Sequence, residues 1–177
     1  MPVKILFQDE ALFGRISDQR KCWAPRIQRP EVARQVVREF LYALAAVDPL
    51  HGDMAALVMP WVDTEVMSIF LAHTAELFSD TFCLMFLDGA GWHTAKGLRI
   101  PPTMKLLWLP PYSPELNPTE HIWEYLRENH FGNTYFDSLD AVEGCLCTSL
   151  HHLAEQPDLV KSMTCFDWIN TLCMTAN

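Results

Sequence analysis

The 177-residue sequence predicts one α/β domain, in which helices cover the faces of a central sheet. Half of the residues are apolar, which is enough to build a sizeable core in a chain of this length. Short apolar runs alternate with segments of helical periodicity along the chain, and this alternation is typical of α/β sheets. No internal repeat or low-complexity segment interrupts the pattern.

The first expected strand covers residues 3–8, VKILFQ, an apolar run that ends at Asp9 and Glu10. Residues 11–18 are expected to form its hairpin partner. Residues 36–47 contain alanines that favour a helix, together with β-branched and aromatic residues that favour a strand. The turn DPLHGD leads straight into the apolar MAALVMPWV, so a strand in a second hairpin is the better interpretation.

The middle of the chain predicts a helix and two further strands. Residues 64–78 carry apolar side chains at steps of three and four behind Asp63, a good N-cap residue. Residues 82–87, FCLMFL, form a continuous apolar strand that ends at Asp88. A short helix should follow, then a third apolar strand at residues 104–109 that runs into a proline-rich loop, and finally terminal helices.

Two of the buried strands are expected to end in aspartate, Asp9 and Asp88. Side chains at strand ends of an α/β sheet line a crevice while the strands fix their positions. If the strands are neighbours, the two carboxylates should therefore converge. Aspartate is also common in the turns that follow strands, so a purely structural role for either residue stays open.

A third carboxylate, Glu120, follows the loop LPPYSPELNP. With Asn117 as N-cap and Pro118 at the first helical position, Glu120 would be a capping-box glutamate. Four prolines within residues 109–118 nevertheless fix the entry of the helix. Such stiffness suits a carboxylate that holds a metal ion, so capping and metal binding are both open at this residue.

Three converging carboxylates without histidine or thiolate partners would be hard oxygen ligands, which select Mg²⁺ or Mn²⁺ over Zn²⁺. Sites of this kind usually handle phosphate. Two ions about 3.5–4 Å apart can activate an attacking oxygen and stabilise the leaving one in a phosphodiester displacement. The carboxylates would repel one another without the cations.

The stretches FQDE, FLDGAGWHTAKG and LWLPPYSPELNPTEHIWEYLR strongly resemble the catalytic domain of insertion-sequence 630 family transposases. That family is related to the mariner-like transposases and lies within the DDE superfamily of endonucleases. The resemblance covers nearly the whole chain and implies an RNase H-like fold, with catalytic aspartates on the first and fourth strands and the last acid on a helix. Motif by motif, the catalytic and metal-binding residues would be Asp9, Asp88 and Glu120, with two Mg²⁺ ions that Mn²⁺ can replace.

The resemblance also implies a function, metal-dependent DNA cleavage and strand transfer during transposition of an insertion sequence. The expected partners are transposon ends and target DNA, bound by a homodimer. Relatives usually carry helix-turn-helix modules ahead of this domain, whereas this chain begins almost on the first catalytic strand, so a separate helix-turn-helix subunit is a further expected partner. The alternatives are a catalytically silent remnant that serves oligomerisation or regulation, and a general RNase H-like nuclease.

Basic residues gather between positions 15 and 29, and an aromatic residue lies among them. This pattern suits contact with the DNA backbone and with unstacked bases, although a solvated hairpin would look the same. The residues concerned are Arg15, Arg20, Lys21, Trp23, Arg26 and Arg29. His93 and Lys96 could approach a phosphate at the start of the short helix after Asp88, and His93 could equally cap or pack.

Other features exclude several function classes. The net charge of −9 argues against a protein that simply coats DNA, because phosphate neutralisation drives such binding. The third glycine of a dinucleotide-binding fingerprint is absent after Gly89 and Gly91. The six cysteines are expected to be reduced thiols, since no secretory signal is recognised. One cysteine and histidine group fits no common zinc spacing: Cys145, Cys147, His151 and His152.

Two further expectations complete the sequence interpretation. No segment approaches the roughly 18 uncharged apolar residues of a membrane span, so a protein without membrane contact is expected. The resemblance implies that it is bacterial, cytoplasmic and nucleoid-associated. Trp92, Trp108 and Trp123 are most simply core residues.

Overall fold

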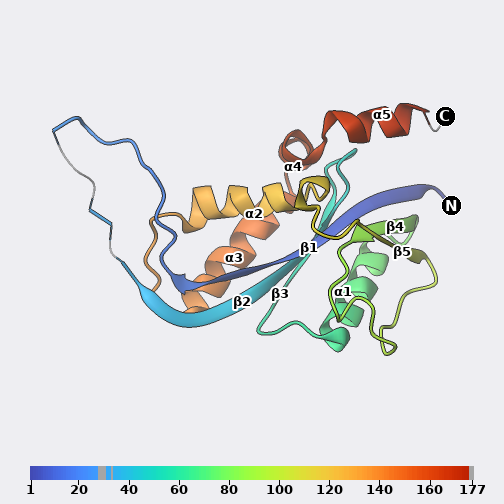
Figure 1. The fold of residues 1–177 in the computed structure, drawn as a ribbon, viewed down its shortest axis with the longest axis horizontal. Helices are drawn as coiled ribbons and strands as arrows, with labels where there is room; N and C mark the ends of the chain where they lie inside the picture. Colours follow the sequence, from blue (N-terminus) through green and yellow to red (C-terminus); the bar gives the residue numbers. More distant parts are fainter. Residues whose placement is uncertain (28–30, 33, 176–177) are drawn as a thin grey trace.

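A computed structural model describes residues 1–27, 31–32 and 34–175 of the chain, with side chains up to residue 171. Its centre is a five-stranded mixed sheet in the order β3-β2-β1-β4-β5 (Figure 1). The strands β1, β2 and β3 are antiparallel neighbours, whereas β4 and β5 run parallel to β1. Their bounds are Val3–Ile16, Val36–Val47, Met54–Met59, Phe82–Leu87 and Met104–Trp108, from β1 to β5.

Helices cover both faces of this sheet, which confirms the predicted architecture. The helix α1 (Thr64–Leu77) lies on one face behind its Asp63 cap, whose carboxylate accepts hydrogen bonds from two first-turn amides. On the other face lie α2 (Glu120–Leu126), which continues as a π-helical segment at Arg127–Phe131, and α3 (Leu139–Ala154) (Figure 1). The helices α4 (Pro157–Thr164) and α5 (Asp167–Thr175) follow. No helix within the described ranges is long and apolar enough to cross a membrane.

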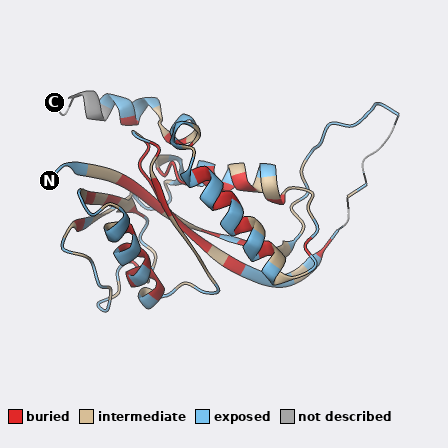
Figure 2. Ribbon diagram, turned by 180° about the vertical axis from the view of Figure 1, so that it is seen from behind, coloured by how far each residue is buried: buried red, intermediate tan, exposed pale blue. Residues whose placement is uncertain are grey.

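The two faces of the sheet carry separate apolar clusters, because successive side chains of a strand point to opposite sides. In β1, Leu6 packs toward the α1 face, whereas Phe7, Ala11 and Phe13 pack toward α2 and α3. Figure 2 shows buried residues in the sheet and on the inward sides of the helices. This alternation directs Asp9 to the α2 face and Glu10 to the α1 face.

One predicted element at the start of the chain is wrong. Residues 11–16 do not turn back to form a hairpin with residues 3–8; they continue the same strand, and β1 is 14 residues long. The antiparallel partner is β2, with Leu12 opposite Tyr42 and Ala11 opposite Ala43. The alternation of Ala11 and Phe13 with exposed Leu12 is uninterrupted, so nothing in this stretch favours a turn. Asp9 consequently lies within a strand.

The prediction of a short helix after Asp88 is also wrong. Residues 88–103 form turns and bends between β4 and β5. This segment contains Gly89, Gly91 and Gly97 and ends in two prolines, residues that are unfavourable in a helix interior. The other predicted strands are confirmed, including β2, whose composition alone was ambiguous.

Two side-chain hydrogen bonds attach the start of α2 to β1. The hydroxyl of Thr119 donates to the carbonyl oxygen of Phe7 (2.7 Å), and the Asn117 amide donates to the carbonyl oxygen of Gln8 (2.9 Å). Both side chains are buried. The parallel pairing of β1 with β4 ends at Phe7, so these bonds replace strand pairing at that point and fix the proline loop against the sheet.

Substitution of Thr119 by valine keeps the side-chain shape but removes this donor. We expect Thr119→Val to lower the free energy of unfolding by about 1–3 kcal/mol, because it leaves a buried carbonyl oxygen with one partner fewer. Urea denaturation of the variant, beside Thr94→Val at an exposed hydroxyl, measures the difference. Equal losses in the two variants would contradict a special role for the Thr119 hydroxyl.

Candidate active site

The structure brings Asp9, Asp88 and Glu120 together in the lining of one cleft of about 680 Å³. The convergence of the two aspartates follows from strand register. The last parallel pair of β1 and β4 is Phe7 with Phe86, and each aspartate lies two residues beyond its member of that pair. Glu120 is the first residue of α2, the helix whose entry is attached to β1 by Thr119 and Asn117.

The electrostatics of Asp9 show how closely the acids approach. Burial and the negative charge of Glu120 raise the pKa of Asp9 to about 7, and Glu10 adds to the rise. The indole N–H of Trp123 donates a hydrogen bond of 2.8 Å to Asp9 Oδ2, which lowers the pKa without offsetting the other effects. Asp9 is therefore a carboxyl group whose charged form is disfavoured by its surroundings.

The capping-box arrangement considered for Glu120 is not the one observed. The backbone amide of Asn117, which such a glutamate would bind, donates to the carbonyl oxygen of Pro114 (2.9 Å). The side-chain oxygen of Asn117 accepts weakly from the amide of Thr119 (3.3 Å). Glu120 is exposed, and its side chain lines the cleft with the two aspartates.

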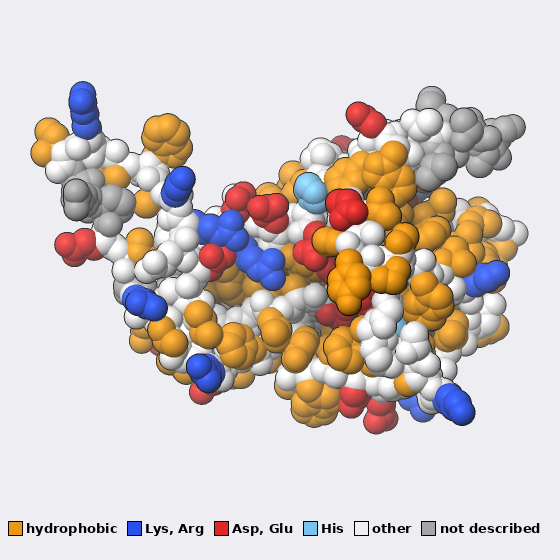
Figure 3. Space-filling view, viewed as in Figure 1, with side chains coloured by type: hydrophobic (Ala, Val, Ile, Leu, Met, Phe, Trp, Pro, Cys, Tyr) orange, Lys and Arg blue, Asp and Glu red, His pale blue; other side chains and the backbone are white. Residues whose placement is uncertain are grey.

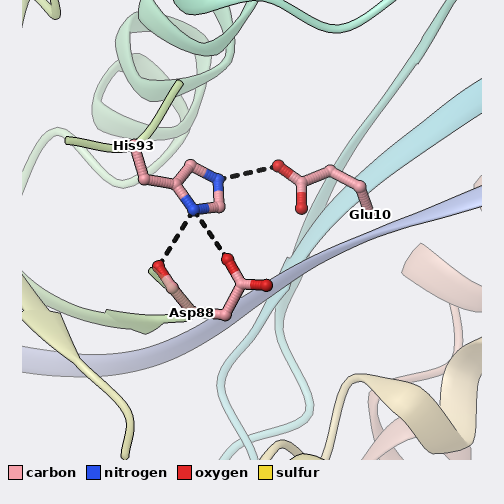
Figure 4. Close-up of side chains that lie close together, drawn as sticks. All are labelled: Glu10, Asp88 and His93. Carbon is pink, nitrogen blue, oxygen red and sulfur yellow. Dashed lines mark hydrogen bonds and ion pairs between the residues drawn. The ribbon is translucent and has the colours of Figure 1, made fainter. Parts of the chain in front are cut away.

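A second group of titratable side chains, formed by Glu10, Asp88 and His93, lies beside the carboxylates (Figure 4). The imidazole of His93 contacts Glu10 Oε1 through Nε2 (2.8 Å) and Asp88 Oδ1 through Nδ1 (2.9 Å). Nδ1 is also 3.0 Å from the main-chain oxygen of Asp88. The indole N–H of Trp92 donates to the same Glu10 oxygen (3.0 Å). The imidazole of His93 thus lies between the carboxylates of Asp88 and Glu10 and contacts both.

The surroundings of His93 favour the protonated form of its imidazole. Burial lowers the pKa of His93, but the hydrogen bond and charge of Glu10 and the contacts with Asp88 outweigh burial and raise it above its ordinary value. Contacts of 2.8 and 2.9 Å are hydrogen-bond distances, and an imidazolium has a donor for each carboxylate.

This geometry corrects the prediction that His93 contacts DNA at a helix start. The His93 side chain is fully buried, both of its ring nitrogens have carboxylate partners, and residues 88–103 form no helix. His93 has the packing role that the sequence left as its alternative. Lys96, its predicted companion, is exposed.

The sequence did not single out Glu10 or Trp123 as supports of the site. The FQDE doublet within an alternating strand is the signal that could have identified Glu10, since it places two acids on opposite faces of one strand. Trp123 is buried as expected, and it also binds Asp9. The expectation for Trp108 is wrong: the side chain is 49% exposed, because it ends the edge strand β5 beside the cleft.

The basic residues between positions 15 and 29 divide into two groups. Arg15 and Arg20 lie at the base of the β1–β2 connection, where both form hydrogen bonds and ion pairs with other residues of the protein. Arg15 donates to the carbonyl oxygens of Phe136 and Asp137 and pairs with Glu39. Arg20 pairs with Asp18, and its backbone exchanges two hydrogen bonds with Asn133.

The second group lies on the arm, the name used below for residues 17–27, which project away from the sheet (Figure 1). Lys21, Trp23 and Arg26 are exposed there, and the Trp23 ring has no contact that covers it. Figure 3 shows Lys and Arg side chains on and below the arm, and acidic side chains toward the centre of the molecule. Arg29 lies outside the described residues. DNA contact by the arm stays a prediction.

Sequence comparison assigns a family. Residues 4–143 match a family model described as DDE superfamily endonuclease. The chain is also similar to the uncharacterized protein y4pE/y4sA of Sinorhizobium fredii (strain NBRC 101917 / NGR234), with 37% identity over 128 residues. That alignment covers 72% of this chain and 95% of the relative.

Solved structures share the fold at low sequence identity. The Mos1 transposase paired-end complex with the left transposon end matches with a TM-score of 0.60 and 17% identity, over 91% of this chain and 55% of that chain. The Mos1 mariner paired end complex with Mn has the same TM-score and identity, over 92% and 56%. This chain therefore spans about half the length of the Mos1 chains. The mixed sheet and its helices are RNase H-like, and the chain belongs to the DDE superfamily of endonucleases.

Proposed function

We propose that this chain is the catalytic domain of a DNA transposase, which cleaves DNA at the ends of an insertion sequence and joins the ends to a target. The observation that carries this proposal is the convergence of Asp9, Asp88 and Glu120 in one cleft. Membership of the DDE endonucleases supports it, since three convergent acids of this kind suit phosphodiester chemistry. The assignment to the insertion-sequence 630 family belongs to the same proposal.

The three carboxylates fit two Mg²⁺ ions, for which Mn²⁺ can substitute. The fit rests on the donor set, which consists of hard oxygens, and on the raised pKa of Asp9, which is caused first by burial and then by the negative charge of Glu120, a charge that a cation would offset. When bound, the ions supply Lewis-acid activation of the attacking oxygen and stabilisation of the leaving oxygen. Asp9, Asp88 and Glu120 would all be ligands.

The surrounding residues would hold the acids in place. Trp123 fixes one oxygen of Asp9 by its indole N–H, and Asp9 lines the cleft. The imidazole of His93 contacts Asp88 through one ring nitrogen and Glu10 through the other, which would keep Asp88 in position. Because the proline loop sets the entry of α2, Glu120 starts from a fixed backbone position, which is the kind of preorganisation that catalytic sites require.

The substrate would be DNA. The Mos1 structures include a complex with a transposon end and a strand transfer complex, so we infer transposon ends and target DNA as the partners here, bound by a homodimer in the bacterial cytoplasm at the nucleoid. On the arm, Lys21 and Arg26 would neutralise phosphates while Trp23 meets unstacked bases. Recognition of the end sequence would require a helix-turn-helix module, which a separate subunit would provide.

Neutralising the proposed ligands tests the catalytic assignment. We expect Asp88→Asn and Glu120→Gln each to reduce nicking of supercoiled plasmid DNA in Mg²⁺ or Mn²⁺ by at least about 100-fold, because outer supports of metal ligands alone are worth roughly 10- to 100-fold. Glu124→Gln, one turn further along α2 on an exposed position, is the matched control. Undiminished nicking in both site variants would refute the assignment, and an inactive wild-type chain would favour the silent remnant.

The raised pKa of Asp9 predicts a pH-dependent stability without divalent metal ions. Between about pH 4 and pH 7 the folded chain holds a proton on Asp9 that the unfolded chain has lost, so the free energy of unfolding should fall as the pH rises. We expect Asp9→Asn, which keeps an acceptor for Trp123, to flatten this dependence and to be the more stable chain at pH 8.

Thermal unfolding at pH 5 and pH 8, with and without Mg²⁺, measures this effect. Mg²⁺ should raise the melting temperature of the wild type at pH 8 but leave Asp9→Asn nearly unchanged. Asp80→Asn, at an exposed position after α1, should behave as the wild type. If the melting temperatures of the wild type and of Asp9→Asn changed in parallel with pH, this would contradict a raised pKa of Asp9.

A further inference from the structure

Tyr112 is fully exposed although it lines the cleft that contains the three carboxylates. Its backbone is in the left-handed region, with φ at 57°, a conformation that is unfavourable for a residue with a bulky side chain. Neither the exposure of a large ring nor the strained backbone stabilises the folded state. Such a combination is found where a functional site requires it.

The loop around Tyr112 is built to hold this conformation. Pro110 and Pro111 precede the tyrosine and Pro114 begins a turn of 3₁₀ helix at Pro114–Leu116, so three fixed φ angles surround it. The hydroxyl of Ser113 donates to the carbonyl oxygen of Pro111 (3.3 Å). A ring presented from a stiff loop loses little conformational entropy when it binds a partner.

A second aromatic ring lines the same cleft. Trp108 is half exposed at the end of β5, where it pairs with Leu87, the residue directly before Asp88. The indole therefore lies next to the strand end that carries a proposed metal ligand. The lining of the cleft thus combines an acidic part, the three carboxylates, with an aromatic part, the rings of Trp108 and Tyr112.

These two parts of the lining match the two parts of a nucleotide. Carboxylates with bound cations attract a phosphate, and the flat face of a base stacks on aromatic rings whatever its sequence. The volume of about 680 Å³ lies within the range of roughly 300–1,000 Å³ that is typical of small-molecule sites. A base attached to the phosphate at the carboxylates would reach the aromatic part of the same cleft.

We propose that Tyr112 and Trp108 form a stacking platform for an unstacked base of the DNA strand whose phosphate lies at Asp9, Asp88 and Glu120. This inference rests on the proposed function and adds a subsite to it. The platform binds any base by its face, so it positions the strand for cleavage without reading its sequence. The hydroxyl of Tyr112 is not needed for this role, whereas its ring is.

The substitution Tyr112→Gly separates this role from a structural one. Glycine adopts left-handed backbone readily, so the variant should be at least as thermally stable as the wild type, whereas it should bind single-stranded DNA more weakly. Loss of one stacked base corresponds to roughly 5- to 150-fold in affinity. Tyr112→Phe should bind as the wild type does. Tyr135→Ala, at an exposed tyrosine outside the cleft, is the matched control and should change nothing.

The measurement is the fluorescence of a single-stranded oligodeoxynucleotide that contains 2-aminopurine, titrated with each variant in the presence of Mg²⁺. Quenching by the wild type and by Tyr112→Phe, and its loss in Tyr112→Gly, supports the platform. Equal quenching by Tyr112→Gly, no quenching by the wild type, or a lower melting temperature of Tyr112→Gly overturns it. A change of oligomeric state in Tyr112→Gly would assign the ring to a second copy of the chain and also overturn the platform.

Plasmid nicking by the same preparations reports on the proposed function separately. A wild type that nicks DNA without quenching the probe refutes the platform alone. If the wild type quenches the probe but does not nick DNA, the platform is supported and the proposed cleavage activity is refuted.

Discussion

The burial of Asp9 beside the negative charge of Glu120 is the constraint on which this site depends. Two parallel strands in fixed register bring Asp9 and Asp88 to the same level of the sheet, and the attachment of α2 to β1 brings Glu120 toward them. Folding must hold these charges together against a rise in the pKa of Asp9 to about 7. Backbone hydrogen bonds and apolar packing on both faces of the sheet supply that force. The fold therefore assembles the site, and bound cations would stabilise the charged form of Asp9.

The alternation of β1 determines how each acid is supported. Asp9 faces α2 and receives the indole N–H of Trp123, whereas Glu10 faces the α1 side and holds His93. His93 in turn holds Asp88. One aspartate is thus supported by an indole N–H in the core and the other by a buried imidazole. The two proposed ligands therefore have different supports, although they line the same cleft.

Much of this arrangement could be predicted from the sequence, because it follows from local patterns. The apolar runs of β4 and β5 and the Asp63 cap of α1 identify their elements directly. The length of β1 could not be predicted in this way, since only the pairing with β2 shows that residues 11–16 continue the strand. The bracing of Asp88 by Glu10 and His93 joins residues 83 positions apart, and burial of a histidine between two acids leaves no periodic signal. The exposure of Trp108 depends on β5 being the edge strand.

The length of β1 also sets the distance between the cleft and the base of the arm. Ile16 lies seven positions beyond Asp9, and a strand rises about 3.3 Å per residue, so the base of the arm lies roughly 23 Å from Asp9. Successive base pairs of B-DNA are about 3.4 Å apart along one strand. If the cleft and the arm contact the same duplex, as proposed, about seven base pairs, less than one helical turn, would separate the two contacts. The strand β1 would then act as a rigid spacer between them.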